Sequence, residues 1–385
     1  MNRALLSLAC CLLLNIGGCA VSNLPQPSDS GFPWHDREFD YRPGIVTVTK
    51  DDLFRLPPDL RAVLQTPEFR QLRFEQRLDR LMTLVFGPPP RHFNYATGHS
   101  SIAAVTWKLK RGDCLSLSVL TYAMGRAMDM SPQIQEVDVP AIFDRRGDLD
   151  VVNQHVNVIF HNVRREMANF QNEAQDLIVD FEPEYGSNRK GRTLDENSVL
   201  ARHYNNLGVD YLASGNATEA YAHFKSAILA DPAYAASYTN LATLYRRASL
   251  QKDAETLLLS AVALSEPPDV ALHSLVALME DTGRPEEAQL YARRLKARER
   301  HDPYFWIGLG ILHLKSGEDR KAVDDLEHAL EMSNGFGDVH RYLAIAYWRV
   351  GNKARAQQQI DALARLDEAD PAVSLLRKKL DSPHP

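Results

Sequence analysis

Residues 110–120 read Lys-Arg-Gly-Asp-Cys-Leu-Ser-Leu-Ser-Val-Leu, and this stretch places a single cysteine, Cys114, at the expected start of a helix. Gly112 permits a tight approach turn, and Asp113 is a favoured N-cap residue. Apolar side chains then recur with helical spacing and predict one broad buried face. These side chains are Leu117, Val119, Leu120, Ala123, Met124 and Ala127.

Cys114 would lie in the first turn of this helix, where exposed backbone N–H groups and the positive end of the helix dipole favour a thiolate. Such a position beside a basic residue can lower a cysteine pKa from about 8.5 to roughly 3.5–7.5. The alternative is a small buried thiol that only fills the core. The rest of the chain favours the reactive interpretation.

The composition is that of an ordinary folded protein. The chain has 385 residues, of which 44% are hydrophobic and 24% charged, and its net charge is −6. This length predicts two or three domains. Because there is no basic excess, no nucleic acid partner is expected.

The first residues have the composition of an export signal. Arg3 supplies a positive charge, residues 4–16 are largely apolar but too short to span a bilayer, and Ile16-Gly17-Gly18 precedes Cys19. Residues 1–18 therefore resemble a bacterial lipoprotein signal peptide. The resemblance implies export, cleavage before Cys19, lipidation of Cys19 and, with Ala20 following, the periplasmic face of the outer membrane. An ordinary secretory signal and an uncleaved anchor helix are the alternatives.

The cysteine count supports a reactive Cys114. Cys10 and Cys11 would leave with the signal and Cys19 would become a thioether, so Cys114 would be the one free thiol of the mature chain. An unpaired thiol in an oxidising compartment is a liability, which suggests that its reactivity is used.

The segment between Cys19 and the cysteine helix divides into three parts. Residues 19–46 are rich in Pro, Ser, Gly and Asp without sustained periodicity, and predict a flexible tether. Residues 58–86 show apolar spacings of three and four and predict a helix that ends at Gly87-Pro88. A second short helix is expected over residues 100–108.

Three segments after the cysteine helix predict strands. Residues 133–139, 151–160 and 176–181 alternate polar and apolar side chains. In the second of them, His155 falls on the face opposite Val156 and Val158. Asp180 lies near the end of the third. The order is therefore a helix with a cysteine, a strand with a histidine and a strand with an aspartate.

This order, with Gly112-Asp113-Cys114, His155-Val156-Asn157 and Val179-Asp180-Phe181, resembles the transglutaminase-like branch of the papain-type cysteine enzymes. The resemblance spans roughly residues 70–185 and implies an α+β domain over residues 47–185. It also implies catalytic roles for Cys114 as nucleophile, His155 as base and Asp180 as the acid that orients the histidine. Such a trio supports acyl transfer through a thioester.

Each member of the trio has a structural alternative. His155 could be a hydrogen-bonded structural histidine and Asp180 a turn residue. The backbone N–H of Cys114 is the natural first oxyanion donor. The second donor stays open among Tyr95, Ser100, Ser101 and Trp107. No histidine pair with metal-ligand spacing occurs, so neither a metal site nor a cofactor is expected.

From Ala201 the chain repeats every 34 residues, in cycles that begin at positions 201, 235, 269, 303 and 337. The seventh position of the cycles carries Leu207, Leu241, Leu275, Leu309 and Leu343, and the twentieth carries Ala220, Ala254, Ala288, Ala322 and Ala356. The fifteenth carries Gly215, Gly283, Gly317 and Gly351, with Ser249 as the exception. Leucine fills a shared core, alanine allows close helix crossing, and glycine makes the turn inside each repeat.

The period resembles the tetratricopeptide repeat, which implies an all-α superhelix over residues 201–370. Residues 186–200 would be a linker and residues 371–385 a C-terminal cap helix and tail. Such arrays bind proteins or peptides on a concave face. The residues that the helix register places toward that face are Asn205, Asn206, Asn240, Arg246, Arg341, Trp348 and Arg349.

Two functions fit this organisation. The first is a membrane-anchored periplasmic cysteine acyl-transfer enzyme that acts on a protein or peptide recruited by the repeats. Hydrolysis is favoured over cross-linking, because water is abundant and no amine site is identified. The second is a non-catalytic scaffold lipoprotein in which both domains bind proteins during envelope assembly.

Overall fold

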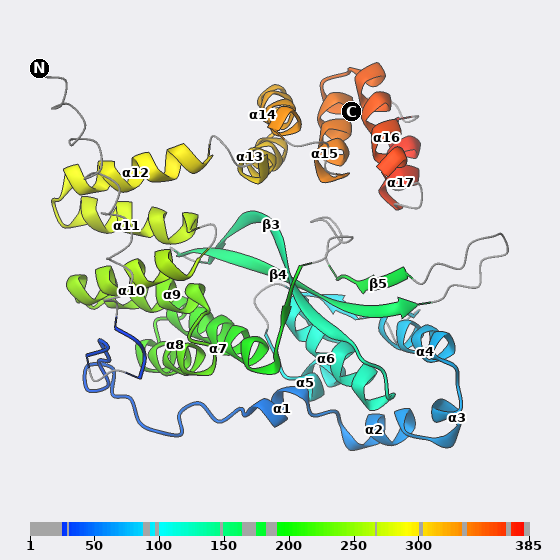
Figure 1. Ribbon diagram of the computed structural model, residues 1–385, viewed down its shortest axis with the longest axis horizontal. Coiled ribbons are helices and arrows are strands. Elements are labelled where there is room, and N and C mark those ends of the chain that lie inside the picture. The colour runs from blue at the N-terminus through cyan, green and yellow to red at the C-terminus, as the bar shows by residue number, and fades with distance from the viewer. Residues whose placement is uncertain are drawn as a thin grey trace, which may run out of the picture. The chain divides into compact units, whose positions relative to one another are not determined.

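The computed structural model describes residues 25–28, 31–87, 93–96, 100–146, 149–163, 175–181, 191–265, 268–299, 303–332, 337–366 and 371–380 (Figure 1). They form two compact units. The first combines the described part of Met1–Thr47 with Tyr204–Ala292, and the second combines Val48–His203 with the described part of Arg293–Pro385. No helix among the described residues is long and apolar enough to cross a membrane.

The second unit begins with four helices, α1 (Lys50–Phe54), α2 (Pro58–Leu64), α3 (Pro67–Arg70) and α4 (Phe74–Phe86). The expectation of one helix over residues 58–86 is therefore wrong, because the chain breaks twice in this range. Pro67 has no backbone N–H to donate to the preceding turn, so it starts a new helix instead of continuing α2. The apolar spacing persists across the breaks because each short helix still buries one face.

Helix α6 (Cys114–Ala127) is the core of this unit, and most of its side chains are buried. It follows α5 (Ala103–Leu109) and the short strand β2 (Arg111–Gly112), which pairs in parallel with β1 (Asn94–Tyr95). The helix has buried residues around most of its circumference, so it is enclosed by other elements instead of facing solvent.

A four-stranded antiparallel sheet contacts α6, in the order β5-β4-β3-β6 (Figure 1). Its strands are β3 (Gln133–Arg146), β4 (Leu149–Val163), β5 (Gln175–Val179) and β6 (Arg192–Leu194). The three expected strands are present, and β6 is an addition within the range 186–200 that we expected to be a linker. Its Thr193 pairs with Gln135 of β3, so residues 192–194 belong to the sheet.

Glu136 of β3 joins the sheet to the helix that follows it. Its Oε1 accepts hydrogen bonds from Arg202 Nε at 3.1 Å and Nη2 at 2.5 Å, and its Oε2 accepts from Arg192 Nη2 at 2.8 Å. The Arg202 side chain is 3% exposed, whereas that of Arg192 is 60% exposed. Burial raises the pKa of Glu136, but the two guanidinium groups outweigh burial and leave this pKa below its usual value.

Helix pairs form the rest of the chain. In the first unit they are α7 (Glu196–Ala213, whose first turns belong to the second unit) with α8 (Ala217–Ala230), α9 (Ala235–Arg247) with α10 (Gln251–Leu264), and α11 (Asp269–Asp281) with α12 (Pro285–Glu299). In the second unit they are α13 (Pro303–Ser316) with α14 (Asp319–Met332), and α15 (Gly337–Arg349) with α16 (Lys353–Leu366), followed by α17 (Pro371–Leu380). Helices α9, α11, α13 and α15 start at the positions where the cycles start.

The turn residue of each repeat has the left-handed backbone that the period predicts. Gly215, Gly283, Gly317 and Gly351 have φ values of 79°, 69°, 77° and 80°, and Ser249 adopts 61°. Glycine reaches this region without steric cost, so the turn is local and repeats wherever the sequence repeats. The alanines at the twentieth position are at most 4% exposed, as close helix crossing requires.

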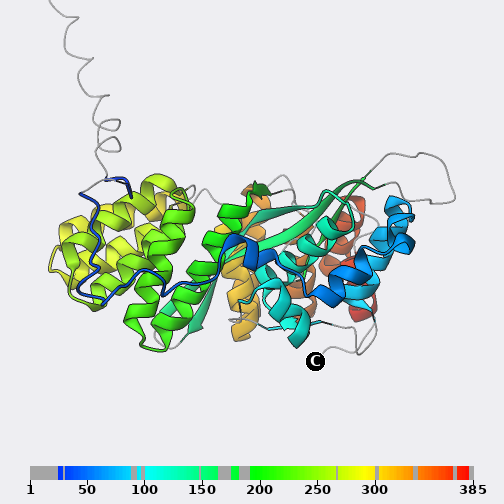
Figure 2. The same ribbon diagram turned by 90° about the horizontal axis from the view of Figure 1, so that it is seen from below.

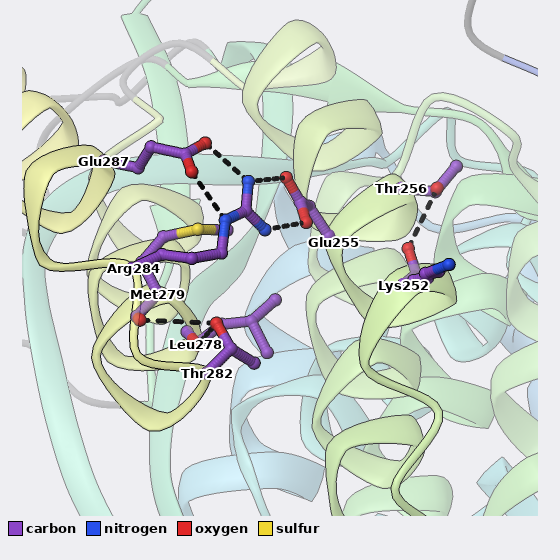
Figure 3. Close-up of polar contacts among 8 residues, drawn as sticks. All are labelled: Lys252, Glu255, Thr256, Leu278, Met279, Thr282, Arg284 and Glu287. Carbon is purple, nitrogen blue, oxygen red and sulfur yellow. Dashed lines mark hydrogen bonds and ion pairs between the residues drawn. The ribbon is translucent and has the colours of Figure 1, made fainter.

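Polar contacts between repeats add to the apolar core of the first unit. Arg284, in the turn between α11 and α12, donates to Glu255 of α10 at 2.5 Å and to Glu287 of α12 at 2.6 Å (Figure 3). Arg247 of α9 donates to the backbone oxygen of Leu212 at the end of α7, at 3.2 Å. A cation at the C-terminal end of a helix interacts favourably with the helix dipole.

Part of the expected tether is packed onto the repeats. Residues 32–41, which we call the strap, lie against helices of the first two repeats, and Figure 2 shows this blue segment running along the green helices. Phe32 and Phe39 are each 5% exposed. The expectation of a flexible tether over residues 19–46 is therefore corrected for the strap, because its aromatic side chains find an apolar surface on the same chain. Residues 1–24, with Cys10, Cys11 and Cys19, lie outside the described residues.

We predict that Glu136→Gln lowers the free energy of unfolding by about 3 kcal/mol at pH 7, because it leaves the buried Arg202 cation without its counter-charge. The pKa of Glu136 is lowered in the folded state, so this stabilisation is present at neutral pH and declines as the pH falls below about 4. Urea denaturation followed by circular dichroism measures both effects. Arg192→Ala, at the exposed partner, is the control and should cost less than about 1 kcal/mol. Equal losses in the two variants would contradict this account.

Candidate active site

The approach to Cys114 is a tightly packed turn. The backbone N–H of Ala96 donates to Gly112 O at 2.9 Å, which ties the turn to β1. A Cβ placed on Gly112 would lie 2.7 Å from Ser116 Cβ and 3.3 Å from Thr106 Cγ2. Only glycine fits here without a shift of the helix start, so the position is set by close approach.

Asp113 is the N-cap of α6, and its buried carboxylate accepts three hydrogen bonds. Oδ1 accepts from the Ser116 backbone N–H at 2.8 Å and from Ser116 Oγ at 2.6 Å, while Oδ2 accepts from Ser100 Oγ. Ser116 Oγ in turn accepts from the Ser101 backbone N–H at 2.8 Å. This network holds the start of α6, and with it the backbone N–H of Cys114, in one position. In the sequence, the spacing Asp-x-x-Ser is the feature that indicates this network.

Cys114 is the first residue of α6 and is 4% exposed. Among the residues that the structure describes, its sulfur forms no disulfide. The predicted position in the first turn of a helix is therefore found, with Asp113 as the predicted cap. The nearby basic residue Lys110 lies against an aromatic side chain, since its Nζ is 2.9 Å from the centroid of the Trp107 ring. Burial lowers the pKa of Lys110 to about 8.

Strand β4 carries His155 past the start of α6. Ser118, one turn beyond Cys114, donates through Oγ to Val156 O at 3.4 Å, and a Cβ on Gly125 would lie 3.1 Å from the Phe160 ring. From Cys114 to Gly125 the helix rises by about 16 Å, and from His155 to Phe160 the strand advances by about 17 Å. The first turns of α6 and the part of β4 that carries His155 therefore lie in the same region of this unit.

His155 is hydrogen-bonded to Asp180, which directly follows β5. His155 Nε2 lies 2.8 Å from both Asp180 carboxylate oxygens, and the two side chains are 3% and 2% exposed. Asn157 Nδ2 donates to Asp180 Oδ2 at 3.2 Å. Val158 pairs with Val179, so Asn157 and Asp180 face each other across the two strands. The structure thus brings together two of the three predicted residues, His155 and Asp180, while Cys114 begins the helix that contacts strand β4.

Asn157 is a residue of this site to which sequence reasoning assigned no role. It is fully buried, and its amide holds the carboxylate that holds His155. The sequence feature that could have indicated this role is the position of Asn157 two residues after His155, which puts both side chains on the same face of one strand.

The second oxyanion donor is still open, but the structure reduces the candidates. Ser100 Oγ is engaged by Asp113, Ser101 Oγ lies 2.8 Å from Thr106 Oγ1, and the Trp107 ring lies against Lys110. Tyr95 pairs with Gly112 across β1 and β2, two residues from Cys114. Tyr95 therefore lies near the start of α6 and stays a candidate.

An aromatic pair lies beside Asp180. The Phe86 ring at the end of α4 stacks on Phe181, with 5.3 Å between ring centroids and 24° between planes. Phe86 is 45% exposed although it is large and apolar. The pair therefore presents an apolar surface to solvent next to the residue that holds His155.

The candidate binding residues of the first unit make contacts between repeats. Asn240 Nδ2 donates to Asn205 Oδ1 at 2.8 Å, and Asn205 is 5% exposed. Arg246 donates to Asp281 Oδ2 at 2.5 Å. Asn206 is half-buried. These polar groups stabilise the stacking of neighbouring repeats, so a role in partner binding stays a prediction.

The candidates of the second unit are similarly engaged. Arg349 donates to Leu314 O at 2.6 Å and to Asp319 Oδ1 at 3.2 Å, and it also lines a hollow of about 520 Å³ at the turns of the last two repeats. Lys379 Nζ lies 4.9 Å from the centroid of the Trp348 ring. Arg341 is half-buried on α15. Within the described ranges of the chain, no group of three or more acidic, histidine or cysteine side chains could hold a metal ion.

Comparison with known proteins bears on the repeats. The family model of the tetratricopeptide repeat matches residues 313–380. A search of curated proteins finds no match. The chain therefore carries tetratricopeptide repeats, a type of repeat that binds proteins or peptides, and its helix pairs α13 to α17 fall within or next to the matched range. The transglutaminase-like identity of residues 47–185 stays a prediction.

Solved structures with likeness to the chain include the following three proteins. YrrB, whose structure is described as a TPR protein with an unusual peptide-binding site, is 17% identical over 46% of this chain and 92% of its own, with a TM-score of 0.25. PilF of Pseudomonas aeruginosa is 18% identical over 48% and 92%, with a TM-score of 0.26. A thermophilic TPR protein of Thermus thermophilus is 21% identical over 47% and 98%, with a TM-score of 0.25. At these TM-scores the three likenesses add nothing to the family model.

We predict that Gly112→Ala lowers the free energy of unfolding by about 1–3 kcal/mol, because its methyl group would push against Ser116 at the helix start. Thermal unfolding monitored by circular dichroism measures this loss. The control is Gly31→Ala, where an added Cβ meets no atom within 4 Å and the change should stay within about 0.5 kcal/mol. A Gly112→Ala protein as stable as the control would show that the turn is not close-packed.

Proposed function

We propose that this protein is a cysteine-dependent acyl-transfer enzyme, with Cys114 as nucleophile, His155 as base and Asp180 as the residue that orients the histidine. One observation supports the proposal most strongly. A buried histidine and carboxylate are hydrogen-bonded at 2.8 Å, and the strand that carries the histidine contacts the helix that begins at Cys114. A histidine with only a structural role would need no cysteine on the helix that contacts its strand.

We assign the two ring nitrogens of His155 to different tasks. Asp180 holds Nε2, so Nδ1 is the nitrogen that exchanges a proton with Cys114 Sγ. The carboxylate stabilises the imidazolium that forms and keeps the ring in one orientation. Asn157 positions the carboxylate through its bond to Oδ2.

The reaction proceeds by acyl transfer in two halves. The Cys114 thiolate attacks the carbonyl carbon of an amide, and the resulting oxyanion is stabilised by the backbone N–H of Cys114, which Asp113 keeps in place. His155 then protonates the leaving amine, and a thioester remains. In the second half His155 removes a proton from water, the hydroxide attacks the thioester, and the acid leaves with Cys114 restored. We favour this hydrolysis over transfer to an amine because no amine site is identified.

The repeats are the part of the chain to which we assign substrate recruitment. The family model establishes tetratricopeptide repeats, so we propose that they recruit the protein or peptide on which Cys114 acts. The alternative is a non-catalytic scaffold, and it is favoured by burial, since Cys114 is 4% exposed and His155 3% exposed. We place the enzyme at the periplasmic face of an outer membrane, anchored through a lipid on Cys19, on the strength of residues 1–19 alone.

The proposal predicts that Cys114 reacts with iodoacetamide well below pH 8, with a low apparent pKa that is lost in His155→Ala. The measurement is the alkylation rate against pH for residues 20–385, in which Cys114 is the one thiol. Asp180→Asn should shift the profile in the same direction, because the imidazolium loses its carboxylate.

The matched control is His161→Ala. His161 lies on the same strand, bonds to Gln133 instead of Asp180, and should leave the alkylation profile unchanged. An unreactive thiol, or a thiol that titrates near 8.5 in every variant, would exclude the enzyme and leave the scaffold.

The anchor predicts that Cys19→Ala moves the protein from the membrane fraction to the soluble fraction of cells, because the lipid attaches to that sulfur. Fractionation with metabolic labelling by a fatty acid measures both the shift and the loss of label. Cys11→Ala is the control and should keep label and membrane association. Membrane association that persists in an unlabelled Cys19→Ala protein would exclude the lipid anchor.

A further inference from the structure

The strap, residues 32–41, contacts the first two repeats through an aromatic cluster. The Phe39 ring stacks on Tyr221 and on Tyr245, with centroid distances of 4.8 and 5.7 Å and interplanar angles of 14° and 6°. Phe32 meets Tyr238 edge to face at 6.2 Å. Tyr221 and Tyr245 are fully buried. The strap therefore covers tyrosines of α8 and α9 with its own aromatic side chains.

The polar contacts of the strap involve its backbone as well as its side chains. Tyr245 Oη donates to Pro33 O at 2.6 Å, and the His35 backbone N–H donates to Tyr221 Oη at 3.0 Å. Tyr221 Oη in turn donates to Asp36 Oδ1 at 2.8 Å. Recognition of an extended segment through its main chain together with selected side chains is how binding domains hold peptides.

One ion pair and one histidine–carboxylate hydrogen bond fix the register of the strap. Lys225 Nζ lies 2.6 Å from Asp36 Oδ1, and His35 Nε2 lies 2.8 Å from Asp253 Oδ2 of α10. Burial raises the pKa of Asp36, but its hydrogen bonds from Lys225 and Tyr221 outweigh this effect and hold the pKa below its usual value. Asp36 is therefore a carboxylate at neutral pH, and it faces the ammonium group of Lys225.

The surface under the strap differs from the rest of the array. The twenty-first position of the cycles is occupied by Tyr221, Glu255, Gln289, Val323 and Gln357, and the twenty-fifth by Lys225, Leu259, Arg293, Glu327 and Asp361. The pair of a tyrosine and a lysine thus occurs in the first cycle alone. Repeat packing does not require these residues, since the other cycles form the same helix pairs without them.

The backbone hydrogen bonds within the strap are those of turns, such as Phe39 N–H to His35 O at 3.2 Å and Tyr41 N–H to Asp36 O at 2.8 Å. None of residues 32–41 is in a helix or a strand, and exposed residues flank it at Gly31 and at Arg42, Pro43 and Gly44. Its order thus depends on contacts made with α8, α9 and α10. It resembles a bound peptide that is covalently joined to its own receptor.

We propose that the surface formed by Tyr221, Lys225, Tyr238, Tyr245 and Asp253 is a peptide-binding site, and that the strap is its resident ligand. The site takes a peptide that adopts the turns of the strap, with aromatic residues at the places of Phe32, Trp34 and Phe39 and an acid at the place of Asp36. Binding is reversible, so a free peptide of this pattern exchanges with the strap once the strap is no longer held in the same chain.

The test replaces Arg42–Gly44, which are exposed, with a protease recognition sequence in the otherwise intact chain. After cleavage, the N-terminal fragment should stay bound at high concentration and leave on dilution, with the helical circular dichroism of the remainder retained. A labelled synthetic peptide of residues 25–43 should then bind one to one, followed by fluorescence anisotropy.

Matched peptides show whether recognition is specific. Phe39→Ala should compete at least about tenfold more weakly, because it removes the buried ring, and Arg37→Ala, at an exposed position, should compete within about twofold. An Asp36→Lys peptide should bind poorly and recover on a Lys225→Glu protein. The proposal is overturned if the cut fragment leaves only when the repeats unfold, if the peptide does not rebind, or if the two alanine peptides compete equally.

Discussion

The carboxylate of Asp113 decides where helix α6 begins, and the candidate site depends on that choice. Its hydrogen bonds to Ser116 and Ser100 are buried, so the loss of the acceptor would leave polar groups without partners inside the protein. Because the helix begins at Cys114, the thiol lies at the end of the helix where backbone N–H groups point outward. A helix that began one turn later would leave Cys114 in a loop.

Strand β4 sets the position of His155, the second residue of the candidate site. It lies between β3 and β5, its consecutive residues 155–160 are buried, and its register sets which residues of β5 it meets. The pairing of Val158 with Val179 places Asn157 opposite Asp180, and Asp180 in reach of His155. A shift of one residue would turn His155 to the other face of the sheet, so the register decides whether the pair can form.

The repeats are built on a different principle. Each cycle folds around its own turn, with left-handed backbone at its glycine or at Ser249, and neighbouring cycles add leucines, alanines and bonds such as Arg247 to Leu212. Contacts between nearest neighbours therefore account for the array. The strap is the exception, because His35 and Asp253 are 218 residues apart in the chain.

The sequence by itself determined the features that arise from local contacts: the helix starting at Cys114, the strands around His155 and Asp180, and the 34-residue repeats. Tertiary structure alone decided the pairing of β6 with β3, the role of Asn157 and the docking of the strap. The physical reason is that helix starts, strand alternation and turns depend on residues within a few positions of each other. The other features depend on contacts between residues far apart in the chain. Residues 19–46 are rich in Pro and Gly, and this composition does not show that aromatic residues such as Phe39 pack against tyrosines of the repeats.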